Sequence, residues 1–392
     1  METESRKSFV AVVPCQSYEE EQVYEAIRQG IRMLGGIEHF VKKGEKILVK
    51  PNFLSAATAE KAVVTHPAVI RGMLRLLKEE GYTQVSFGDS PGHGSCETAA
   101  KKIGLTSEKE TFGAVCARMS EEVLVPFPEG MTAKKFYFAK EVTEADAIIN
   151  LCKMKTHALE RVTGAVKNVY GLICGYRKAA GHVEFPNASV FARMLVDIHR
   201  CTKPRLHIMD GIVAMEGNGP GSGTPIPMNV LLFSEDPVAL DTIFCHLVDL
   251  DPELVPTNAQ GAVMGIGTYR EEEIEILLQD QGQDRTVSIE ELKKRYGNPG
   301  FDVDRKGEKK TFLSRYSKAM TSLARRPVID EKKCIRCGIC VSHCPVPGKA
   351  VDFRKGKEKP PVYDYRKCIR CYCCQEMCPR HAITVKGKRN MQ

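Results

Sequence analysis

Two cysteine runs with the same spacing near the end of the chain constrain its fold more than any other feature. The runs are Cys334-x2-Cys337-x2-Cys340-x3-Cys344-Pro345 and Cys368-x2-Cys371-x2-Cys374-x3-Cys378-Pro379. Three thiolates on one tight loop can bind three irons of a cubic cluster, while the fourth iron needs a thiolate from elsewhere in the fold. The runs therefore predict a small domain that binds two 4Fe-4S clusters.

Zinc is the main alternative for these cysteines. Zinc sites usually pair C-x2-C knuckles with histidine and lack the third cysteine and the C-P ending. Residues 328 to 388 resemble two-cluster bacterial ferredoxins, which implies a β-α-β repeat and a low-potential one-electron carrier. In such ferredoxins the fourth cysteine of each run binds the other cluster. The resemblance thus assigns cluster one to Cys334, Cys337, Cys340 and Cys378, and cluster two to Cys368, Cys371, Cys374 and Cys344.

Cysteine usage and hydropathy indicate where the protein works. Nine of the 16 cysteines fall at or between these metal-ligand positions, which favours a reducing, anaerobic cell interior over a disulfide framework. No apolar run approaches the roughly 20 residues needed to span a bilayer, and the first residues lack a signal-peptide core. We therefore expect a cytoplasmic protein with no membrane contact.

Charge is distributed unevenly along the chain. The net formal charge is +8, but residues 326–392 alone carry 16 Lys and Arg against 6 Asp and Glu. A basic electron-transfer domain attracts acidic partners, so we expect an acidic redox partner of the ferredoxin or flavodoxin type. The alternative is that these lysines only solvate a small domain. Nucleic acid is not expected, because no recognition helix or aromatic platform accompanies the basic residues.

Before the cysteine runs, short β-branched segments alternate with helical patterns. The strands are predicted at Phe9–Val13, Lys46–Val49, Gln84–Phe87, Ala147–Leu151, Leu206–Met209 and Val230–Phe233, with helices at Tyr18–Leu34, Pro67–Glu80, Ala188–Arg200 and Pro237–Val248. This alternation predicts a layered α/β domain with a mixed or mostly parallel sheet in two lobes, joined to a small α+β ferredoxin-like domain. The predicted boundaries are 1–300 for the α/β domain, 301–327 for a linker with an amphipathic helix at Phe312–Ala324, and 328–392 for the cluster domain.

Polar clusters follow three of the predicted strands. They are VKPN at 49–52, GDSPGHGS at 88–95 and NLCKMKTH at 150–157. In open α/β sheets, ligands collect beyond the carboxyl ends of the strands. We therefore expect one cleft to be lined by Lys50, Asn52, Asp89, Ser90, His93, Lys153, Lys155 and His157.

The stretch from Lys153 to His182 is the most basic part of the α/β domain. It adds Lys167, Asn168, Lys178 and His182 to the cleft residues, and Glu160 is almost its only acid. Cations in a partly apolar segment repel one another unless an anion joins them. This pattern favours a pocket for a carboxylate or phosphate, the alternative being a solvated basic face. Lys153, Lys155 and Lys167 are predicted to anchor the anion, and His157 or His182 to donate protons.

These motifs carry a family resemblance. VKPN, GDSPG, the segment from KMKTH to KNVYG, DGIVAMEGNGP at 210–220 and DPVALD at 236–241 resemble the family called domain of unknown function 362. The resemblance covers roughly residues 10 to 290. Members often carry a C-terminal ferredoxin domain, as this chain does. The family implies no activity.

The remaining thiols are expected to be small buried hydrophobes. They are Cys15, Cys96, Cys116, Cys152, Cys201 and Cys245, and Cys152 is the best candidate among them for a reactive thiolate. Cys174 stands in GLICG, where the family resemblance implies a proline.

Two main hypotheses follow. The first is an oxidoreductase that passes low-potential electrons from the clusters to an anionic substrate or cofactor in the basic cleft. The alternative is a non-enzymatic electron-transfer or maturation protein that docks a partner protein. A third possibility is that the clusters serve only as structural elements or as an oxygen sensor.

Overall fold

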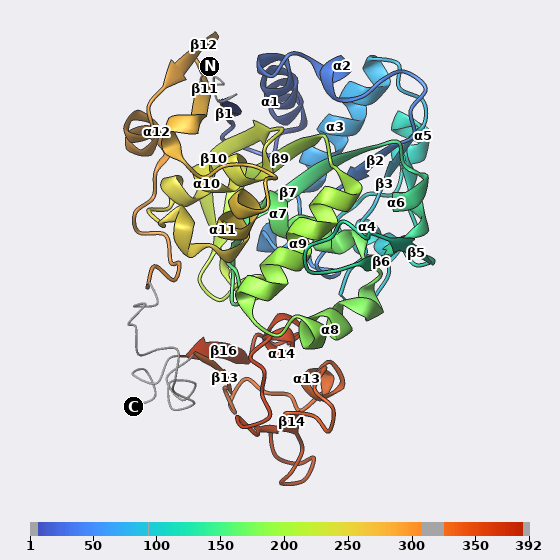
Figure 1. Ribbon diagram of the computed structural model, residues 1–392, viewed down its shortest axis with the longest axis vertical. Coiled ribbons are helices and arrows are strands. Elements are labelled where there is room, and N and C mark those ends of the chain that lie inside the picture. Colours follow the sequence, from blue (N-terminus) through green and yellow to red (C-terminus); the bar gives the residue numbers. More distant parts are fainter. Residues whose placement is uncertain (1–6, 93, 307–324, 387–392) are drawn as a thin grey trace.

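The computed structural model describes residues 7–92, 94–306 and 325–386. They form two parts: a main domain, residues 7–306, and a C-terminal module, residues 325–386, which lies against one end of the main domain (Figure 1). The predicted linker helix lies outside the described residues.

One large sheet runs through the main domain. Its strands are β1 (Ser8–Pro14), β2 (Ile47–Lys50), β3 (Val85–Phe87), β4 (Val115–Cys116), β7 (Ala147–His157), β8 (Arg161–Thr163), β9 (Leu206–Glu216), β10 (Thr224–Ser234), β11 (Ile274–Asp280) and β12 (Gln283–Val287). Their order is β12-β11-β1-β10-β9-β7-β2-β3-β4, with β8 beside β7. Neighbours from β9 to β4 run parallel, whereas β10 runs antiparallel to both β1 and β9. The predicted α/β class with a mixed sheet is confirmed.

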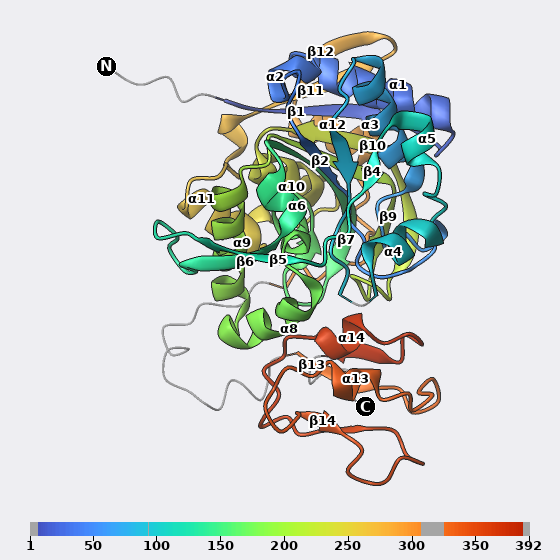
Figure 2. The ribbon, with the colours of Figure 1, turned by 90° about the vertical axis from the view of Figure 1, so that its right-hand side faces the viewer.

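Helices cover both faces of this sheet. They are α1 (Glu20–Met33), α2 (Ile37–Phe40), α3 (Pro67–Glu79), α4 (Cys96–Lys102), α5 (Glu108–Phe112), α6 (Lys140–Glu144), α7 (Ala165–Asn168), α8 (Gly175–Glu184), α9 (Ala188–Thr202), α10 (Pro237–Leu247), α11 (Pro256–Val263) and α12 (Ile289–Tyr296). Figure 2 shows α1 and α3 on one side of the sheet and α9, α10 and α11 on the other. A separate hairpin, β5 (Glu122–Pro126) and β6 (Lys135–Ala139), and four short 3-10 turns complete the domain.

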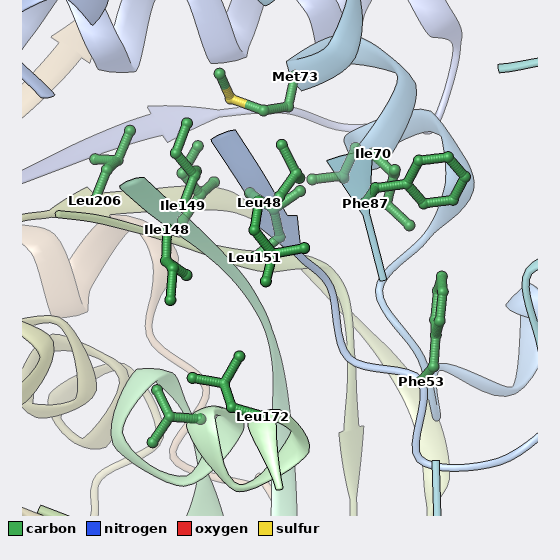
Figure 3. Packing of buried hydrophobic residues seen from close by; sticks show 14 of the residues in the cluster. Leu48, Phe53, Ile70, Met73, Phe87, Ile148, Ile149, Leu151, Leu172 and Leu206 are labelled. Atoms are coloured by element: carbon green, nitrogen blue, oxygen red, sulfur yellow. The ribbon is translucent and has the colours of Figure 1, made fainter. Parts of the chain in front are cut away.

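The core around the parallel strands is built from large apolar side chains (Figure 3). Leu48 of β2 and Ile149 and Leu151 of β7 are completely buried, and Ile70 and Met73 of α3 lie over them. Each such side chain contributes roughly 1.5–3 kcal/mol when buried. This packing fixes the strand ends from which the polar clusters project.

The C-terminal module is small and contains two short antiparallel strand pairs. Strand β13 (Arg326–Ile329) pairs with β16 (Ile383–Lys386), and β14 (Val351–Asp352) pairs with β15 (Val362–Tyr363). Its helices are α13 (Ile339–Ser342) and α14 (Cys373–Glu376). In both views α14 lies on the side of the module that faces α8 and the main domain (Figures 1 and 2).

Candidate functional site

Strand β7 carries three of the predicted site residues. The sequence places the end of this strand at Leu151, but the structure continues it through His157, so that boundary was wrong. Lys153, Lys155 and His157 are therefore strand residues, each at most 4% exposed. Buried charges are costly unless they are paired, so the partners of these side chains decide what each can do.

The ammonium of Lys153 is neutralised inside the main domain. Its Nζ donates to Asp210 Oδ2 at 2.7 Å and to the Tyr18 hydroxyl at 2.9 Å. Tyr18 in turn donates to Asp210 Oδ1 at 2.7 Å. This closed triangle leaves Lys153 committed to the fold.

Lys50 and Asp89 form a second buried pair, at the ends of β2 and β3. Lys50 Nζ lies 3.1 Å from Asp89 Oδ1 and donates to the Pro51 carbonyl at 2.9 Å. The Phe53 amide donates to Asp89 Oδ2 at 2.6 Å. Gly171 permits this arrangement, because a Cβ there would lie 1.7 Å from Asp89 Oδ1.

A ladder of side-chain amides holds Lys155. Lys155 Nζ donates to Asn52 Oδ1 at 2.9 Å and to the Val63 carbonyl at 2.5 Å. Asn52 Nδ2 donates to Asn168 Oδ1, and Asn168 Nδ2 donates to Asn150 Oδ1. Burial lowers the pKa of Lys155 to about 7, with the nearby Lys167 charge acting in the same direction. Lys155 can thus exchange a proton near neutral pH.

Two further lysines come from α7 and α8. Lys167 Nζ lies 4.8 Å from the ring centre of Tyr170 and 5.4 Å from that of Phe191. Within the described residues no hydrogen bond or ion pair reaches this ammonium, and burial lowers its pKa. Lys178 donates to the Ser90 carbonyl, and burial lowers its pKa to about 8. Lys167 is thus the cation with most need of an anionic partner.

Two imidazoles lie beside these lysines. The amides of Leu159 and Glu160 both donate to His157 Nδ1 at 3.1 Å, so the ring proton is on Nε2, which lies 3.2 Å from Glu376 Oε1. His182 stacks on Phe191 with ring centres 4.4 Å apart, and its Nδ1 has no partner among the described residues. Burial lowers the pKa of both rings, that of His182 to about 3, so both are neutral at physiological pH.

A cavity of about 470 Å³ brings these groups together between the main domain and the C-terminal module. Most predicted site residues line it: Asn52, Asp89, Ser90, Lys155, His157, Lys167, Asn168, Lys178 and His182. Lys50 and Lys153 do not line it, and His93 lies outside the described residues. The module contributes His343, Cys373, Glu376 and Met377. The cleft expected in one domain is thus closed by the other part of the chain.

Hydrogen bonds seat α14 on the main domain at this cavity. Gln375 Nε2 donates to the carbonyls of Asn218 and Gly219 at 2.9 and 3.1 Å. Asn218 Nδ2 donates to the Ile383 carbonyl at 3.0 Å, and His381 Nδ1 lies 2.7 Å from Ser222 Oγ. The loop at 217–223, with the sequence GNGPGSG, is therefore a docking surface for the module.

The cysteines of the module are arranged around its short helices. Cys334, Cys337, Cys340 and Cys378, the set assigned to cluster one, line a single small cavity of about 20 Å³. Backbone amides donate to two of the module's sulfurs: Ala350 to Cys344 and Ala382 to Cys378, both at 3.3 Å. The Tyr363 hydroxyl donates to Cys374 Sγ at 3.2 Å. Donors aimed at sulfur are what a thiolate ligand of a cluster needs, so these residues fit one.

Comparison with known proteins identifies both parts of the chain. Residues 47–246 match the model of the family described as domain of unknown function, DUF362, and residues 326–379 match that of a 4Fe-4S dicluster domain. The protein belongs to the DUF362 family. Its C-terminal module is an iron–sulfur electron-transfer module of the ferredoxin type, here called the dicluster module. The DUF362 match includes every main-domain residue that lines the cavity. It does not include the lining residues of the dicluster module.

One curated relative is the thylakoid-associated protein sll1697 of Synechocystis, 34% identical over 264 residues, which are 66% of this chain and 79% of the relative. Two solved structures are more distant. The lactate racemase apoprotein of Thermoanaerobacterium thermosaccharolyticum is 14% identical with a TM-score of 0.38, and a structural-genomics protein of Thermotoga maritima is 17% identical with a TM-score of 0.31. The chain covers only 58% and 53% of these two structures. Across the described residues, no helix combines the length and apolar character needed to cross a bilayer.

Several residues at the cavity, or at the contact between the main domain and the dicluster module, were not predicted. Glu376 and Gln375 lie between cluster cysteines, so sequence reasoning treated them as part of the cysteine run. Tyr170 was noted only as part of a motif. Cys152, the best candidate for a reactive thiolate, is fully buried, and burial raises the pKa of its thiol well above the ordinary value, which agrees with the expected small buried hydrophobe. A single acid within CCQEMCP was the one available signal for Glu376.

Proposed function

We propose that this DUF362 protein is an oxidoreductase that passes low-potential electrons from two 4Fe-4S clusters to an anionic substrate or cofactor in the cavity. One observation carries the proposal: the same cavity is lined by main-domain cations and by Cys373, Glu376 and Met377 of the dicluster module. Cys373 and Glu376 belong to α14 and Met377 directly follows it, so all three lie between the cluster cysteines Cys371 and Cys378 in the chain. A molecule in the cavity is therefore held by one part of the chain and lies beside the electron carrier of the other.

Two sets of four cysteines would hold the clusters. We assign cluster one to Cys334, Cys337, Cys340 and Cys378, and cluster two to Cys368, Cys371, Cys374 and Cys344. The small cavity lined by all four residues of the first set supports this crossing of the fourth ligands. Such clusters, when bound, supply electrons one at a time.

The lysines give the cavity its preference for anions. Among the described residues, no hydrogen bond or ion pair reaches the Lys167 ammonium, and Lys155 and Lys178 line the same cavity. The acids that line it are Asp89, which is paired with Lys50, and Glu376, whose charge acts on Lys167 without forming an ion pair with it among the described residues. A carboxylate or phosphate of the substrate would complete the pairing of Lys167, and charge-assisted contacts of this kind contribute about 1.5–3 kcal/mol each.

Electrons that reduce an organic acid must be accompanied by protons. Lys155, with a pKa of about 7, is suited to give up a proton at neutral pH. His157 lines the cavity with its Nε2 3.2 Å from Glu376 Oε1, whereas the low pKa of His182 suits it to accept a hydrogen bond. We therefore place Lys155 beside His157 and His182 as a proton-handling residue.

The outer face of the dicluster module is suited to an acidic redox partner. Cys337 is exposed, Ile335 is 54% exposed, and Arg336 and Lys333 flank them. A ferredoxin or flavodoxin type of protein would be drawn there by charge, and its binding would weaken steeply with salt. If that docking is the whole function, the protein is a carrier or maturation factor, as the alternative hypothesis holds.

A reoxidation experiment separates enzyme from carrier. The protein is purified anaerobically, its iron and sulfide are counted, and its clusters are reduced with titanium(III) citrate and mixed with a panel of small carboxylic and phosphorylated acids. We expect about eight irons per chain and faster cluster reoxidation with at least one acid, accompanied by a reduced product. Reoxidation by an acidic protein acceptor alone, with no response to any acid, would favour the carrier.

A further inference from the structure

Two cysteines of the main domain, expected to be isolated, lie side by side. Cys96 begins α4, Cys116 ends β4, and their sulfurs are 3.9 Å apart. A disulfide needs its sulfurs at about 2.05 Å, so oxidation of this dithiol requires the two sulfurs to move closer together. The pair lies far along the chain from the cysteines of the dicluster module.

The two sulfurs open onto different spaces. Cys96 is 1% exposed and lines the large cavity that Lys167 and Cys373 also line. Cys116 is partly exposed and lines a separate surface hollow of about 490 Å³, together with Lys46 and Glu144. Since β4 is the last strand of the sheet, nothing in the sheet covers Cys116 on that side. The dithiol therefore connects the inner cavity with the protein surface.

Local hydrogen bonds divide the roles of the two sulfurs. The Asp89 amide donates to Cys96 Sγ at 3.4 Å, and the Cys96 thiol lies in hydrogen-bonding range of Cys116. That bond from Cys96 lowers the pKa of Cys116, whereas the same bond, together with burial, raises the pKa of Cys96. The negative charge thus prefers Cys116, the sulfur that faces outward, and a thiolate is the form that attacks a disulfide.

We propose that Cys96 and Cys116 form a redox-active dithiol that reduces a disulfide substrate presented at the surface hollow. The Cys116 thiolate attacks one sulfur of the substrate disulfide, forming a mixed disulfide and expelling the other half as a thiolate. Cys96 Sγ, losing its proton, then attacks the Cys116 sulfur. This forms the Cys96–Cys116 disulfide and releases the second half as a thiol.

Restoring the dithiol requires two electrons and two protons. The electrons are of the kind that the dicluster module carries, and Cys96 lies on the wall of the cavity that the module closes. This restoring step rests on the proposed function, because it needs electrons to reach the cavity. The exchange steps at Cys116 do not rest on it.

Disulfide mapping tests the exchange steps. The anaerobic, cluster-loaded protein is treated with oxidised glutathione, free thiols are blocked with N-ethylmaleimide, and peptides are examined by mass spectrometry. We expect a Cys96–Cys116 cross-link in the native chain and in Cys201→Ser, a control that removes a partly exposed cysteine elsewhere. In Cys96→Ser we expect Cys116 to be trapped as its glutathione adduct. Maleimide on both Cys96 and Cys116 after this treatment would overturn the proposal.

A reductive titration tests the restoring step. The cross-linked protein is titrated with titanium(III) citrate and its cluster absorbance is followed. Because a disulfide accepts two electrons, we expect it to take up about two more electrons per chain than Cys116→Ser, with the cross-link lost. If the cross-linked protein and Cys116→Ser take up equal numbers of electrons and the cross-link stays intact, the clusters do not supply electrons to this dithiol. The reoxidation of the clusters by small acids is measured separately, so failure here and failure of the proposed function are distinguishable.

Discussion

Glu160 is a fully buried acid, and neither of its carboxyl oxygens has a hydrogen-bond partner among the described residues. It lies in the turn after β7, and its own amide donates to His157 Nδ1 at 3.1 Å. Burial raises the pKa of Glu160 from its ordinary value of 4.5 to about 8, although the charge of Lys167 opposes the shift. The carboxyl is therefore protonated at neutral pH, and ionising it costs stability.

The protonation of Glu160 makes the stability of the folded protein depend on pH. Between pH 4.5 and 8 the folded protein holds a proton on Glu160 that the unfolded chain releases, so stability falls as the pH rises through this range. Glu160→Gln removes the titration. We expect the variant to melt at a higher temperature than the native protein at pH 9 and to differ little near pH 4.5. Melting curves for both proteins at several pH values measure the difference, and parallel curves would contradict the assignment.

Residue types at the site could be predicted from the sequence, but their pairing could not. Lys167 and Asn168 were recognisable because polar side chains interrupted an apolar segment. Lys153 looked equivalent to Lys155 until the structure placed Asp210 and Tyr18 against it. These partners are 57 and 135 residues away, and no local pattern carries such pairings.

At the scale of elements, the turn η2 (Val169–Leu172) presses closely on the Lys50–Asp89 pair. In Gly171→Ala the added Cβ would lie 1.7 Å from Asp89 Oδ1 and 2.6 Å from Lys50 Nζ. Either the turn moves or the buried pair separates, and breaking such a pair costs about 3–5 kcal/mol. We expect a large loss of thermal stability and soluble yield.

Gly300→Ala is the matched control for that substitution. Gly300 is exposed, and a Cβ there would meet only Asn298 Oδ1, at 3.4 Å. Melting temperatures of both variants provide the comparison. A Gly171→Ala protein as stable as Gly300→Ala would show that η2 does not hold the pair in place.

Most elements of the main domain were readable from the sequence because apolar periodicity and helix caps are local. Asp236 caps α10 and His66 caps α3, each directly before a proline at the first helical position. The extent of β7 was misjudged, since three basic residues resemble a loop. They continue the strand because β7 pairs with the neighbouring strand β9 and because distant residues form hydrogen bonds with the basic side chains.

In the whole molecule, the cavity stays closed only while the dicluster module remains bound to the main domain. Asn218 contributes at both ends: its Nδ2 donates to Ile383, and its Oδ1 accepts from Gln375 at 3.1 Å. Asn218→Ala removes both bonds, each worth about 0.5–1.5 kcal/mol. We expect faster hydrogen–deuterium exchange in α14 and β16, with unchanged iron content.

Asn298→Ala serves as the control, because that side chain accepts a hydrogen bond from Gly300 within the main domain. Its exchange in α14 and β16 is expected to match the native protein. Unchanged exchange in Asn218→Ala would mean that other contacts hold the module. The contact between the two parts could not be predicted from the sequence. It brings together Glu376 and His157, which lie far apart along the chain, whereas the cysteine runs alone predict an independent ferredoxin domain.

A comparison of Lys167→Met with Lys102→Met tests whether an anion held by Lys167 in the cavity accepts electrons from the clusters. Lys102→Met removes an exposed lysine from α4 and serves as the control. Clusters of each protein are reduced with titanium(III) citrate and mixed with the same panel of small acids in a stopped-flow spectrometer. The account predicts that at least one acid reoxidises the clusters of the native protein and Lys102→Met at similar rates, and those of Lys167→Met at least about tenfold more slowly, since one charge-assisted contact is lost. Equal rates in all three proteins, or no response to any acid, would contradict it.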